Sequence, residues 1–350
     1  MKQRLFLMLT VLPACSVAQE ASVGFSLPIT VTGGAFSYEG EREAGFRTVA
    51  YPTLKLGRHW FLGGAIQASS RPYFYEQFDT QGRGLKGDLL QGYAGYSHTS
   101  GNKSVVVKTG VLSSAFGSFL LRYDDAVNPL IDMPQAYGYY YKQVTTLGLP
   151  GAQVDFSAGK LDTRIQFTNS SPANRRSLFD HAQYPNWAGG AGYTVRQGLR
   201  LGTSFYRGPY LHREHRFFRR GEERPRDLPG AGYGLDLQFA RGHWYVNAEL
   251  QRFQLAYKIV PTFSMLAGYG ELKYVFHPRW YVATRVGHRQ SNRSPERDVF
   301  EFAVGFRPNR VQLVKVGYQM PRGPGVETRE DSILGIQLVT TWGGPTLVFR

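Results

Sequence analysis

The chain has 350 residues and a formal net charge of +15, from 41 Lys and Arg against 26 Asp and Glu, which favours anionic partners such as lipid headgroups or small anions. Gly (41), Tyr (22) and Phe (23) are abundant, whereas only 19% of the residues are charged, a low share for a soluble domain. The single cysteine, Cys15, excludes a small exported fold held together by disulfides.

Residues 1–18 have the composition of a signal peptide. Two basic residues precede the apolar stretch 5–12, and small residues end the segment at Ala18. We therefore expect the mature protein to be exported after cleavage near Ala18, with a formal charge of 15 − 2 = +13. Cleavage before Cys15, at a lipoprotein box, is the alternative. No apolar stretch reaches the roughly 20 residues that a membrane-spanning helix needs.

Three tryptophans begin stretches with a two-residue period. Trp60, Trp244 and Trp280 each follow a short turn that carries basic side chains. After each of them apolar residues alternate with polar ones, as in a strand with one apolar and one polar face. The core of a soluble β-sandwich would alternate in the same way. Trp at one end of the apolar face, beside a basic turn, is typical of the boundary between membrane and water, so we interpret these three residues as interfacial aromatics.

The same alternation predicts sixteen strands in chain order. We expect them at 24–36, 46–56, 59–70, 85–98, 103–113, 150–157, 161–170, 187–195, 199–208, 231–240, 243–254, 264–276, 279–290, 298–307, 310–319 and 332–342. Short and long connections alternate between these strands, and the third long one, 114–149, is the longest. A transmembrane barrel has short turns at one rim and long loops at the other, which a sandwich or propeller does not require. We therefore predict one all-β domain, 19–350, folded as a transmembrane antiparallel β-barrel.

In these features the chain resembles the outer-membrane porins of Gram-negative bacteria over nearly the whole mature sequence. Phe116-Gly117-Ser118 and residues 128–132, NPLID, resemble the phosphate-selective type. The resemblance implies a water-filled channel for small hydrophilic solutes and a homotrimer in the outer membrane. It also implies that segment 114–149 folds into the lumen as a constriction loop, because irregular backbone is tolerated at membrane depth only inside a barrel. The chain departs from the porin pattern at its last residue, Arg350, where an aromatic residue is usual.

If the apolar face of each strand meets lipid, parity along the strands turns a set of charged side chains toward the lumen. Eight are basic: Lys55, Lys108, Arg164, Arg200, Lys273, Arg285, Arg289 and Lys315. Five are acidic: Asp162, Asp236, Glu249, Glu271 and Glu301. Basic side chains in a lumen lower the barrier for negative solutes, so we expect passive diffusion with a mild anion preference. The alternative is that these charges pair with one another along a solvated wall.

The expected constriction loop carries four charged residues, Arg122, Asp124, Asp125 and Asp132. The three acids would face the basic wall and create a transverse electric field across the opening. Alternatively, they accept hydrogen bonds from nearby backbone N–H groups, as Asp does in irregular segments. The tyrosines at 137 and 139–141 would either offer a stacking surface to solutes or pack the loop against the wall.

Residues 207–227 contain seven arginines, His212 and His215, and form either a solvated loop or a bridge to lipopolysaccharide. The histidine spacing is not that of a zinc hydrolase, and we expect no metal and no cofactor. A barrel enzyme, such as a lipase or protease, is one alternative function, although Ser97 and His98 are adjacent and would point to opposite faces of a strand. A non-conducting structural or adhesion barrel is another alternative, and export argues against nucleic-acid binding.

Overall fold

The structure is a computed structural model that describes residues 23–38, 41–71, 84–137, 148–169, 185–209, 229–256, 261–292, 295–324, 332–344 and 346–349. The signal peptide expected at 1–18, the tyrosines at 139–141 and most of segment 207–227 lie outside these residues. In the described part of the chain, no helix is long and apolar enough to cross a membrane.

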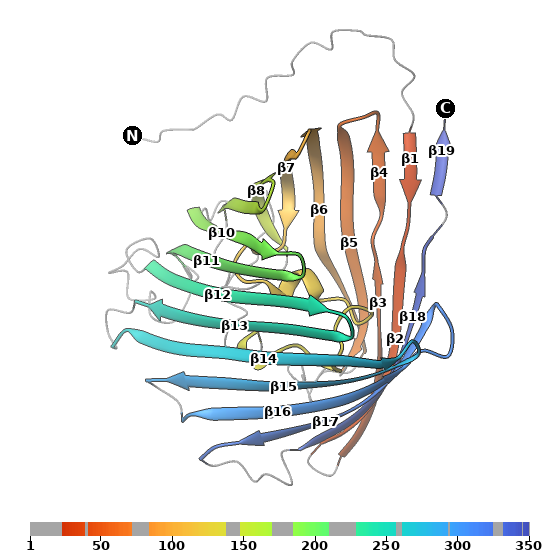
Figure 1. Ribbon diagram of the computed structural model, residues 1–350, viewed down its shortest axis with the longest axis vertical. Coiled ribbons are helices and arrows are strands. Elements are labelled where there is room, and N and C mark those ends of the chain that lie inside the picture. The colour runs from red at the N-terminus through yellow and green to blue at the C-terminus, as the bar shows by residue number, and fades with distance from the viewer. Residues whose placement is uncertain are drawn as a thin grey trace.

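Nineteen strand segments form a single sheet (Figure 1). They are β1 (Val23–Ser26), β2 (Ile29–Tyr38), β3 (Glu41–Ala50), β4 (Thr53–Leu56), β5 (Trp60–Arg71), β6 (Gly84–Ser100), β7 (Lys103–Leu112), β8 (Leu149–Ala158), β9 (Leu161–Asn169), β10 (Pro185–Arg196), β11 (Leu199–Pro209), β12 (Pro229–Arg241), β13 (Trp244–Leu255), β14 (Phe263–His277), β15 (Trp280–Ser291), β16 (Arg297–Phe306), β17 (Gln312–Arg322), β18 (Ile333–Trp342) and β19 (Thr346–Phe349).

The sheet closes on itself as an antiparallel barrel of sixteen strands. β1 and β2 are parts of one strand, because β1 pairs with β4 and β19 while β2 pairs with β3 and β18. β3 with β4, and β18 with β19, are interrupted strands of the same kind. Figure 1 shows β1 beside β19, where the two ends of the sheet meet. Closure pairs the backbone groups of both edge strands, and it confirms the predicted sixteen-stranded barrel.

The two faces of the barrel wall differ in chemistry. Apolar side chains such as Leu62, Ile66, Leu235 and Leu250 are exposed on the outer face. The alternate positions of the same strands carry buried polar residues, and we call the face that they share the inner face. These residues include Arg47, Gln67, Gln153, Gln166, Ser204, Glu249, Gln251, Glu271, Arg285, Glu301, Lys315, Gln319 and Gln337. A two-residue period therefore separates an apolar surface from a polar interior.

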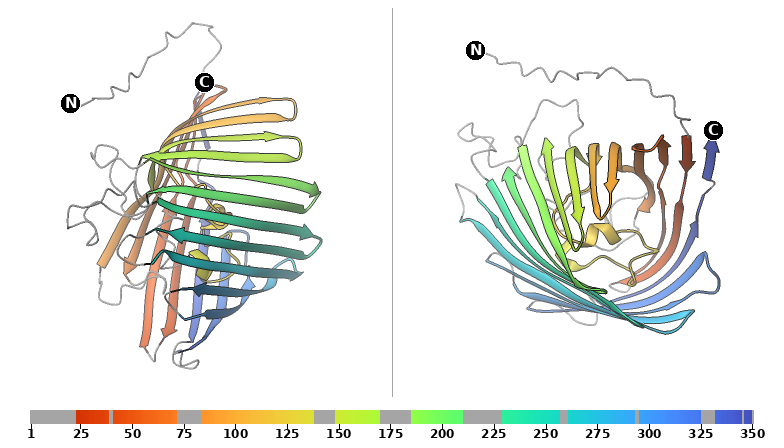
Figure 2. Two further views of the ribbon diagram at one scale, coloured as in Figure 1. Left: turned by 90° about the vertical axis from the view of Figure 1, so that its left-hand side faces the viewer. Right: turned by 45° about the horizontal axis from the view of Figure 1, so that its top comes forward.

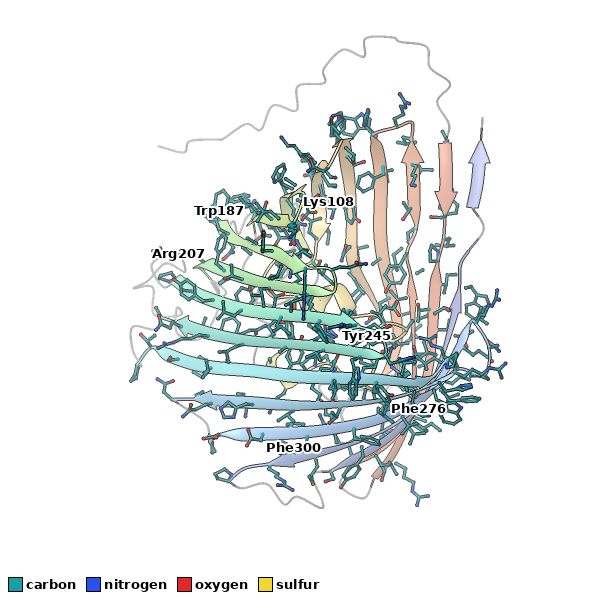
Figure 3. The ribbon with its side chains drawn as sticks, in the orientation of Figure 1. Lys108, Trp187, Arg207, Tyr245, Phe276 and Phe300 are labelled. Atoms are coloured by element: carbon teal, nitrogen blue, oxygen red, sulfur yellow. The ribbon has the colours of Figure 1, made fainter. Side chains whose placement is uncertain are left out.

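The predicted tryptophans begin strands at the rim where the short turns lie. Trp60, Trp244 and Trp280 are the first residues of β5, β13 and β15, and all three are exposed. Each ring contacts an aromatic ring on a neighbouring strand: Tyr96 at 5.1 Å, Tyr274 at 4.3 Å and Phe306 at 4.3 Å between centroids. Figure 3 shows Tyr245 and Phe276 close to this rim and Trp187 and Arg207 at the other ends of their strands. Aromatic pairs thus recur at one rim of the outer face.

The connections follow the expected alternation, with one difference. Five short turns contain a glycine with φ between +58° and +82°, which glycine adopts without steric cost: Gly57, Gly101, Gly159, Gly198 and Gly242. The connection expected at 37–45, however, is short, because β2 and β3 pair as far as Tyr38 and Glu41. Residues 41–45 have low intrinsic strand propensity, and the ladder hydrogen bonds that β2 supplies override it.

The connection from β7 to β8 is described as far as Tyr137. It contains two short 3-10 helices, η2 (Phe119–Arg122) and η3 (Gln135–Tyr137). Figure 2 draws both helices between opposite sides of the sheet. Phe116 and Ala136 are completely buried. We call residues 113–137 the anchored segment, because side chains of many strands hold it.

Candidate functional site

Arg47 in β3 holds the middle of the anchored segment. Its Nη2 lies 2.7 Å from Oδ1 of Asp125, and its Nε donates to Oδ2 at 3.1 Å. The same guanidinium donates to the carbonyl of Tyr123, at 3.2 Å, and both charged side chains are only 2% exposed. The hydroxyl of Tyr51 donates to the neighbouring Asp124. A two-point ion pair of this kind fixes the orientation as well as the position of the segment.

Arg285 in β15 lies at the centre of a second, fully buried group. Its guanidinium contacts Glu271 of β14 at 2.8 Å and Glu301 of β16 at 3.1 Å. It also donates to the carbonyl of Asp132 at 2.9 Å and to the side-chain oxygen of Asn128 at 3.1 Å. Two wall carboxylates therefore compensate the buried charge while its remaining donors bind the segment, as a buried charge requires.

Lys315 in β17 binds the backbone of the same stretch. Its ammonium donates to the carbonyls of Asp125 at 3.0 Å, Asn128 at 3.3 Å and Leu130 at 2.9 Å, and the side chain is completely buried. Next to it, the Tyr281 hydroxyl donates to the carbonyl of residue 129, and the Gln337 amide donates to that of residue 131. The NPLID stretch is thus held through its main chain, which satisfies carbonyls that no strand partner reaches.

Glu249 in β13 binds the start of the segment. Its carboxylate accepts hydrogen bonds from the Ser118 backbone at 3.2 Å, the Ser118 hydroxyl at 3.0 Å and the Tyr137 hydroxyl at 2.5 Å. Burial, and then the Glu249 charge, raise the pKa of the Tyr137 phenol well above its usual range, so that it remains a donor. Gly117 turns the chain here with φ +78°, and a Cβ on it would lie 2.0 Å from the Tyr137 hydroxyl. Only glycine fits this conformation and this space.

Aromatic side chains fill the space between the segment and the wall. Phe116 packs on Phe253 with centroids 5.2 Å apart, and Phe119 packs on Tyr137 at 5.3 Å and on Tyr269 at 6.4 Å. All five are buried and belong to one apolar cluster. Offset and edge-on rings of this kind stabilise a contact by about 0.5–1.5 kcal/mol beyond the area that they bury.

The charged residues expected in the loop contact either the barrel wall or the backbone next to them. Arg122 donates to Glu271 at 2.7 Å and to the Tyr269 hydroxyl at 2.9 Å. Asp124 accepts from the backbone of Ala126, and Asp132 from the backbone of Met133. Together with the Arg47 pair, these contacts engage all three acids. Asp125 faces a basic side chain of the wall, as expected, whereas the backbone contacts of Asp124 and Asp132 are those of the alternative, local capping.

A second group of charges crosses the wall from β7 to β12. Lys108 lies 2.9 Å from Asp155, and Arg164 also reaches Asp155, at 3.2 Å. Arg200 contacts Asp162 at 2.6 Å and Asp236 at 2.7 Å. Figure 3 shows Lys108 near the upper end of the wall. We call these six residues the ladder. Except for Asp236, whose side chain is 8% exposed, their side chains are partly exposed, in contrast to those that hold the anchored segment.

The eight predicted basic residues thus fall into different environments. Arg285 and Lys315 are buried against the anchored segment, and Lys108, Arg164 and Arg200 belong to the ladder. Lys273 lies over the Tyr281 ring, 4.5 Å from its centroid. Lys55 is exposed and Arg289 is half-buried. All five predicted acids lie on the inner face, and each contacts a base or an anchored residue.

Two charged residues of the site were not among those predicted from the sequence. Arg47 lies in a predicted strand, between the outward positions of Phe46 and Thr48, and parity alone would have placed it on the inner face. Asp155 lies in another predicted strand, beside the outward-facing Val154. Both carry charge at an inner position of a strand, so the signal was present in the alternation.

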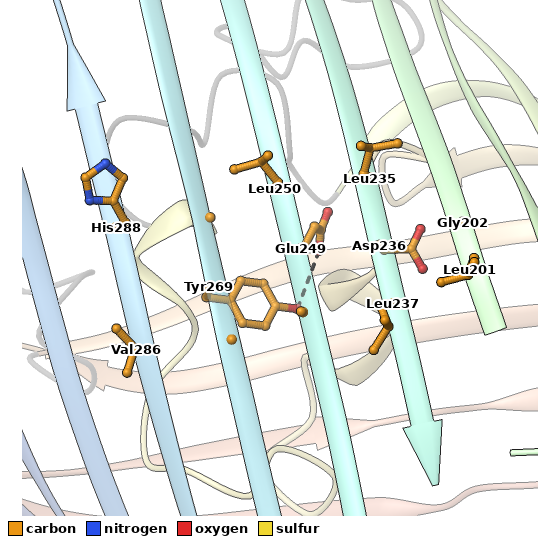
Figure 4. A pocket seen from close by; sticks show the side chains of 13 residues that line it. Leu201, Gly202, Leu235, Asp236, Leu237, Glu249, Leu250, Tyr269, Val286 and His288 are labelled. Atoms are coloured by element: carbon orange, nitrogen blue, oxygen red, sulfur yellow. Dashed lines mark hydrogen bonds between the residues drawn. The ribbon is translucent and has the colours of Figure 1, made fainter. Parts of the chain in front are cut away.

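The outer face carries a hollow of about 660 Å³ across β11–β15, and Asp236 and Glu249 are among the residues that line it (Figure 4). Leu235, Leu250 and Val286 line it, and the outward positions 268 and 270 are glycines. His288 lies at its edge, 2.7 Å from Asp298 and 3.8 Å from Glu296. These three residues offer metal-ligating atoms within 4.8 Å of one another, but they are substantially exposed and an ion pair accounts for their contacts.

No protein family and no curated protein matches the sequence. Solved structures match the fold. OmpT, an outer-membrane protein of Vibrio cholerae in a trimer form, superposes with a TM-score of 0.62 and 9% identity, over 91% of this chain and 99% of that one. OprB of Pseudomonas putida gives 0.61 and 13%, over 92% and 94%. An anion-selective porin of Comamonas acidovorans gives 0.61 and 10%, over 91% and 100%.

Identities of this size establish a common fold and nothing finer. The closed sheet, the number of strands and the alternation of short and long connections agree with the likeness to these structures. The chain has the fold of the sixteen-stranded outer-membrane porins.

Proposed function

We propose that the protein is an outer-membrane porin, a water-filled channel through which small hydrophilic solutes diffuse passively. The division of the barrel wall into an exposed apolar outer face and a polar inner face supports this most directly. An apolar band suits hydrocarbon, and a polar interior suits water. The aromatic pairs beside Trp60, Trp244 and Trp280 would then lie at the level of the lipid headgroups.

We infer that the anchored segment folds into the lumen and narrows it. The proposal rests on contacts from inner-face side chains of β3, β13, β15 and β17. The opening would then lie between Leu121, which is 63% exposed, and the ladder on the facing wall. In this proposal, transport needs only a passage of fixed width and its electric field, with no covalent step and no cofactor.

The mild anion preference depends on basic residues outside the ion pairs of the wall. Arg285 and the three basic residues of the ladder are paired with acids. We propose that Lys55 and Lys273 supply the excess positive charge along the passage. An excess of basic side chains along a pore lowers the barrier for negative solutes.

In this proposal the exported protein lies in the outer membrane after loss of residues 1–18, and the arginine-rich segment 207–227 contacts lipopolysaccharide. A homotrimer is proposed by analogy with the trimer form of OmpT. Gly64 and Ala68, on the outer face of β5, would allow close approach of a second protomer, because they present little side chain.

An enzyme or an adhesion barrel is the alternative function. The register places Ser97 opposite Val106 and His98 opposite Val105, on opposite faces of β6, which does not favour a nucleophile activated by its neighbour. Two of the proteins with this fold are described as porins. We therefore favour a channel over both alternatives.

The test is the single-channel conductance of the purified protein in a planar bilayer, with a salt gradient across it. We expect stable, ohmic steps and a reversal potential of the sign for anion selectivity. A cation-selective potential would retain the channel and refute the role of the excess bases. The absence of steps from a correctly folded, inserted barrel would refute the channel itself.

A further inference from the structure

A polar pocket of about 140 Å³ lies between the anchored segment and the wall. Ser118 and Leu121 line it on the segment side. On the wall side it is lined by four charged residues of the ladder, together with small and polar residues of β10–β12: Asp162, Arg164, Arg200, Asp236, Gly190, Ala191, Thr203, Ser204 and Gln238. The pocket thus lies in the passage that the proposed function requires.

The ladder balances its own charge. Lys108, Arg164 and Arg200 are matched by three carboxylates, Asp155, Asp162 and Asp236, and each contact is 3.2 Å or shorter. The guanidinium groups would attract a monovalent anion in the pocket, but the neighbouring carboxylates would repel it. For a monovalent cation, the carboxylates would attract and the guanidinium groups would repel. The pocket therefore does not favour solutes of a single charge.

Glycines shape the wall beneath the ladder. A Cβ at Gly192 would lie 1.9 Å from the guanidinium of Arg200, and a Cβ at Gly202 would lie 2.2 Å from the carboxylate of Asp236. Because these inner positions carry no side chain, Arg200 crosses β10 and reaches Asp162 on β9. The two glycines therefore leave room for the side chains of Arg200 and Asp236 to lie along the wall, and the pocket stays open.

Two members of the ladder keep capacity for a ligand. The ion pair of Arg164 with Asp155 uses the Arg164 Nε, and the Arg164 side chain is 28% exposed. The carboxylate of Asp162 is 45% exposed. Asp162 and Arg164 project from the same face of β9. They are two residues apart, so their Cα atoms are separated by about 6.6 Å along the strand. A guanidinium and a carboxylate thus lie side by side in one pocket.

We propose that this pocket selects small zwitterionic solutes, whose carboxylate binds Arg164 while their ammonium binds Asp162. The inference rests on the proposed channel and names the class of solute that the channel favours. A zwitterion pairs with both charges of the pocket at once. An uncharged solute makes no ionic contact, and a solute with a single charge is repelled by the residue of like charge.

The experiment measures uptake into proteoliposomes for three probes of one size: alanine, its uncharged isomer lactamide, and sodium lactate. Liposomes without protein correct for leakage through lipid. We expect alanine to enter about threefold faster than lactamide, the size of effect that partly exposed ion pairs produce, and faster than lactate. Arg164→Gln and Asp162→Asn should each bring the alanine-to-lactamide ratio close to one.

Arg241→Gln is the matched control, because this arginine lies at the last position of β12, opposite Trp244, outside the pocket. It should keep the wild-type ratio. Equal entry of alanine and lactamide into wild-type vesicles, or faster entry of lactate, would overturn the zwitterion site and leave the channel intact. If no probe enters, the proposed channel fails, and the site fails with it.

Discussion

Two parts of the inner wall use the same residue types for different purposes. Between β13 and β17, Glu249, Arg285 and Lys315 are buried and bind the anchored segment. Between β7 and β12, the six residues of the ladder bind one another, and all but Asp236 are partly exposed. The two regions differ because the anchored segment covers the residues between β13 and β17 and leaves the ladder open. Charge on an inner strand position is therefore not evidence of a pore-lining role until burial is known.

The largest expected effect is at Arg285. Arg285→Gln leaves Glu271 and Glu301 buried without their shared partner, which typically costs about 3–5 kcal/mol. We expect a lower urea midpoint for unfolding and a higher single-channel conductance, because the segment loses a principal contact. Arg200→Gln in the ladder is the control, and it should change the free energy of unfolding by about 1 kcal/mol or less. Equal losses in both variants would remove the distinction between the two regions.

Gly117 tests whether the segment needs its tight turn. Gly117→Ala places a Cβ 2.0 Å from the Tyr137 hydroxyl at φ +78°, and we expect a cost of about 1–3 kcal/mol. The readout is the urea midpoint together with noise in the single-channel current. Gly270→Ala is the matched control, because a Cβ there meets nothing within 4 Å. A conductance trace and a urea midpoint like those of the wild type would show that the segment does not need this turn.

The Tyr137 phenol makes the stability that the anchored segment contributes sensitive to alkaline pH. Its pKa is raised in the folded protein by burial, so its contribution to stability is complete below the unfolded pKa of about 10 and is lost as the pH rises above it. We expect the urea midpoint to fall more steeply above pH 10 in the wild type than in Tyr137→Phe. Tyr193→Phe, at an exposed outer position, should keep the wild-type decline. Identical slopes in all three proteins would contradict this role.

The smallest effect on stability is expected in the ladder. Asp155→Asn removes the carboxylate that Lys108 and Arg164 share, and exposed pairs of this kind contribute about 1 kcal/mol or less. It leaves positive charge in excess, so the reversal potential should move toward stronger anion selectivity. Asp298→Asn, on the outer face, should leave that potential unchanged. An unchanged reversal potential in Asp155→Asn would place Asp155 outside the solute path.

The sequence was most informative where a short rule repeats. The alternation after Trp60, Trp244 and Trp280 predicted strands, faces and a closed barrel, and all eight predicted bases have inner-face positions. It failed at residues 37–45, where pairing between β2 and β3 overrode weak local propensity. It also did not separate Arg285 and Lys315 from the ladder, because parity reports the direction of a side chain and not what covers it.

By itself, the sequence determined the architecture, since hydrophobic alternation and turn chemistry are local and act strand by strand. The tertiary structure alone decided which charges are buried. Arg47 and Asp125 are 78 residues apart, and Lys315 reaches carbonyls 185 to 190 residues away. No local pattern predicts such contacts, because they depend on how an irregular segment packs across the completed barrel.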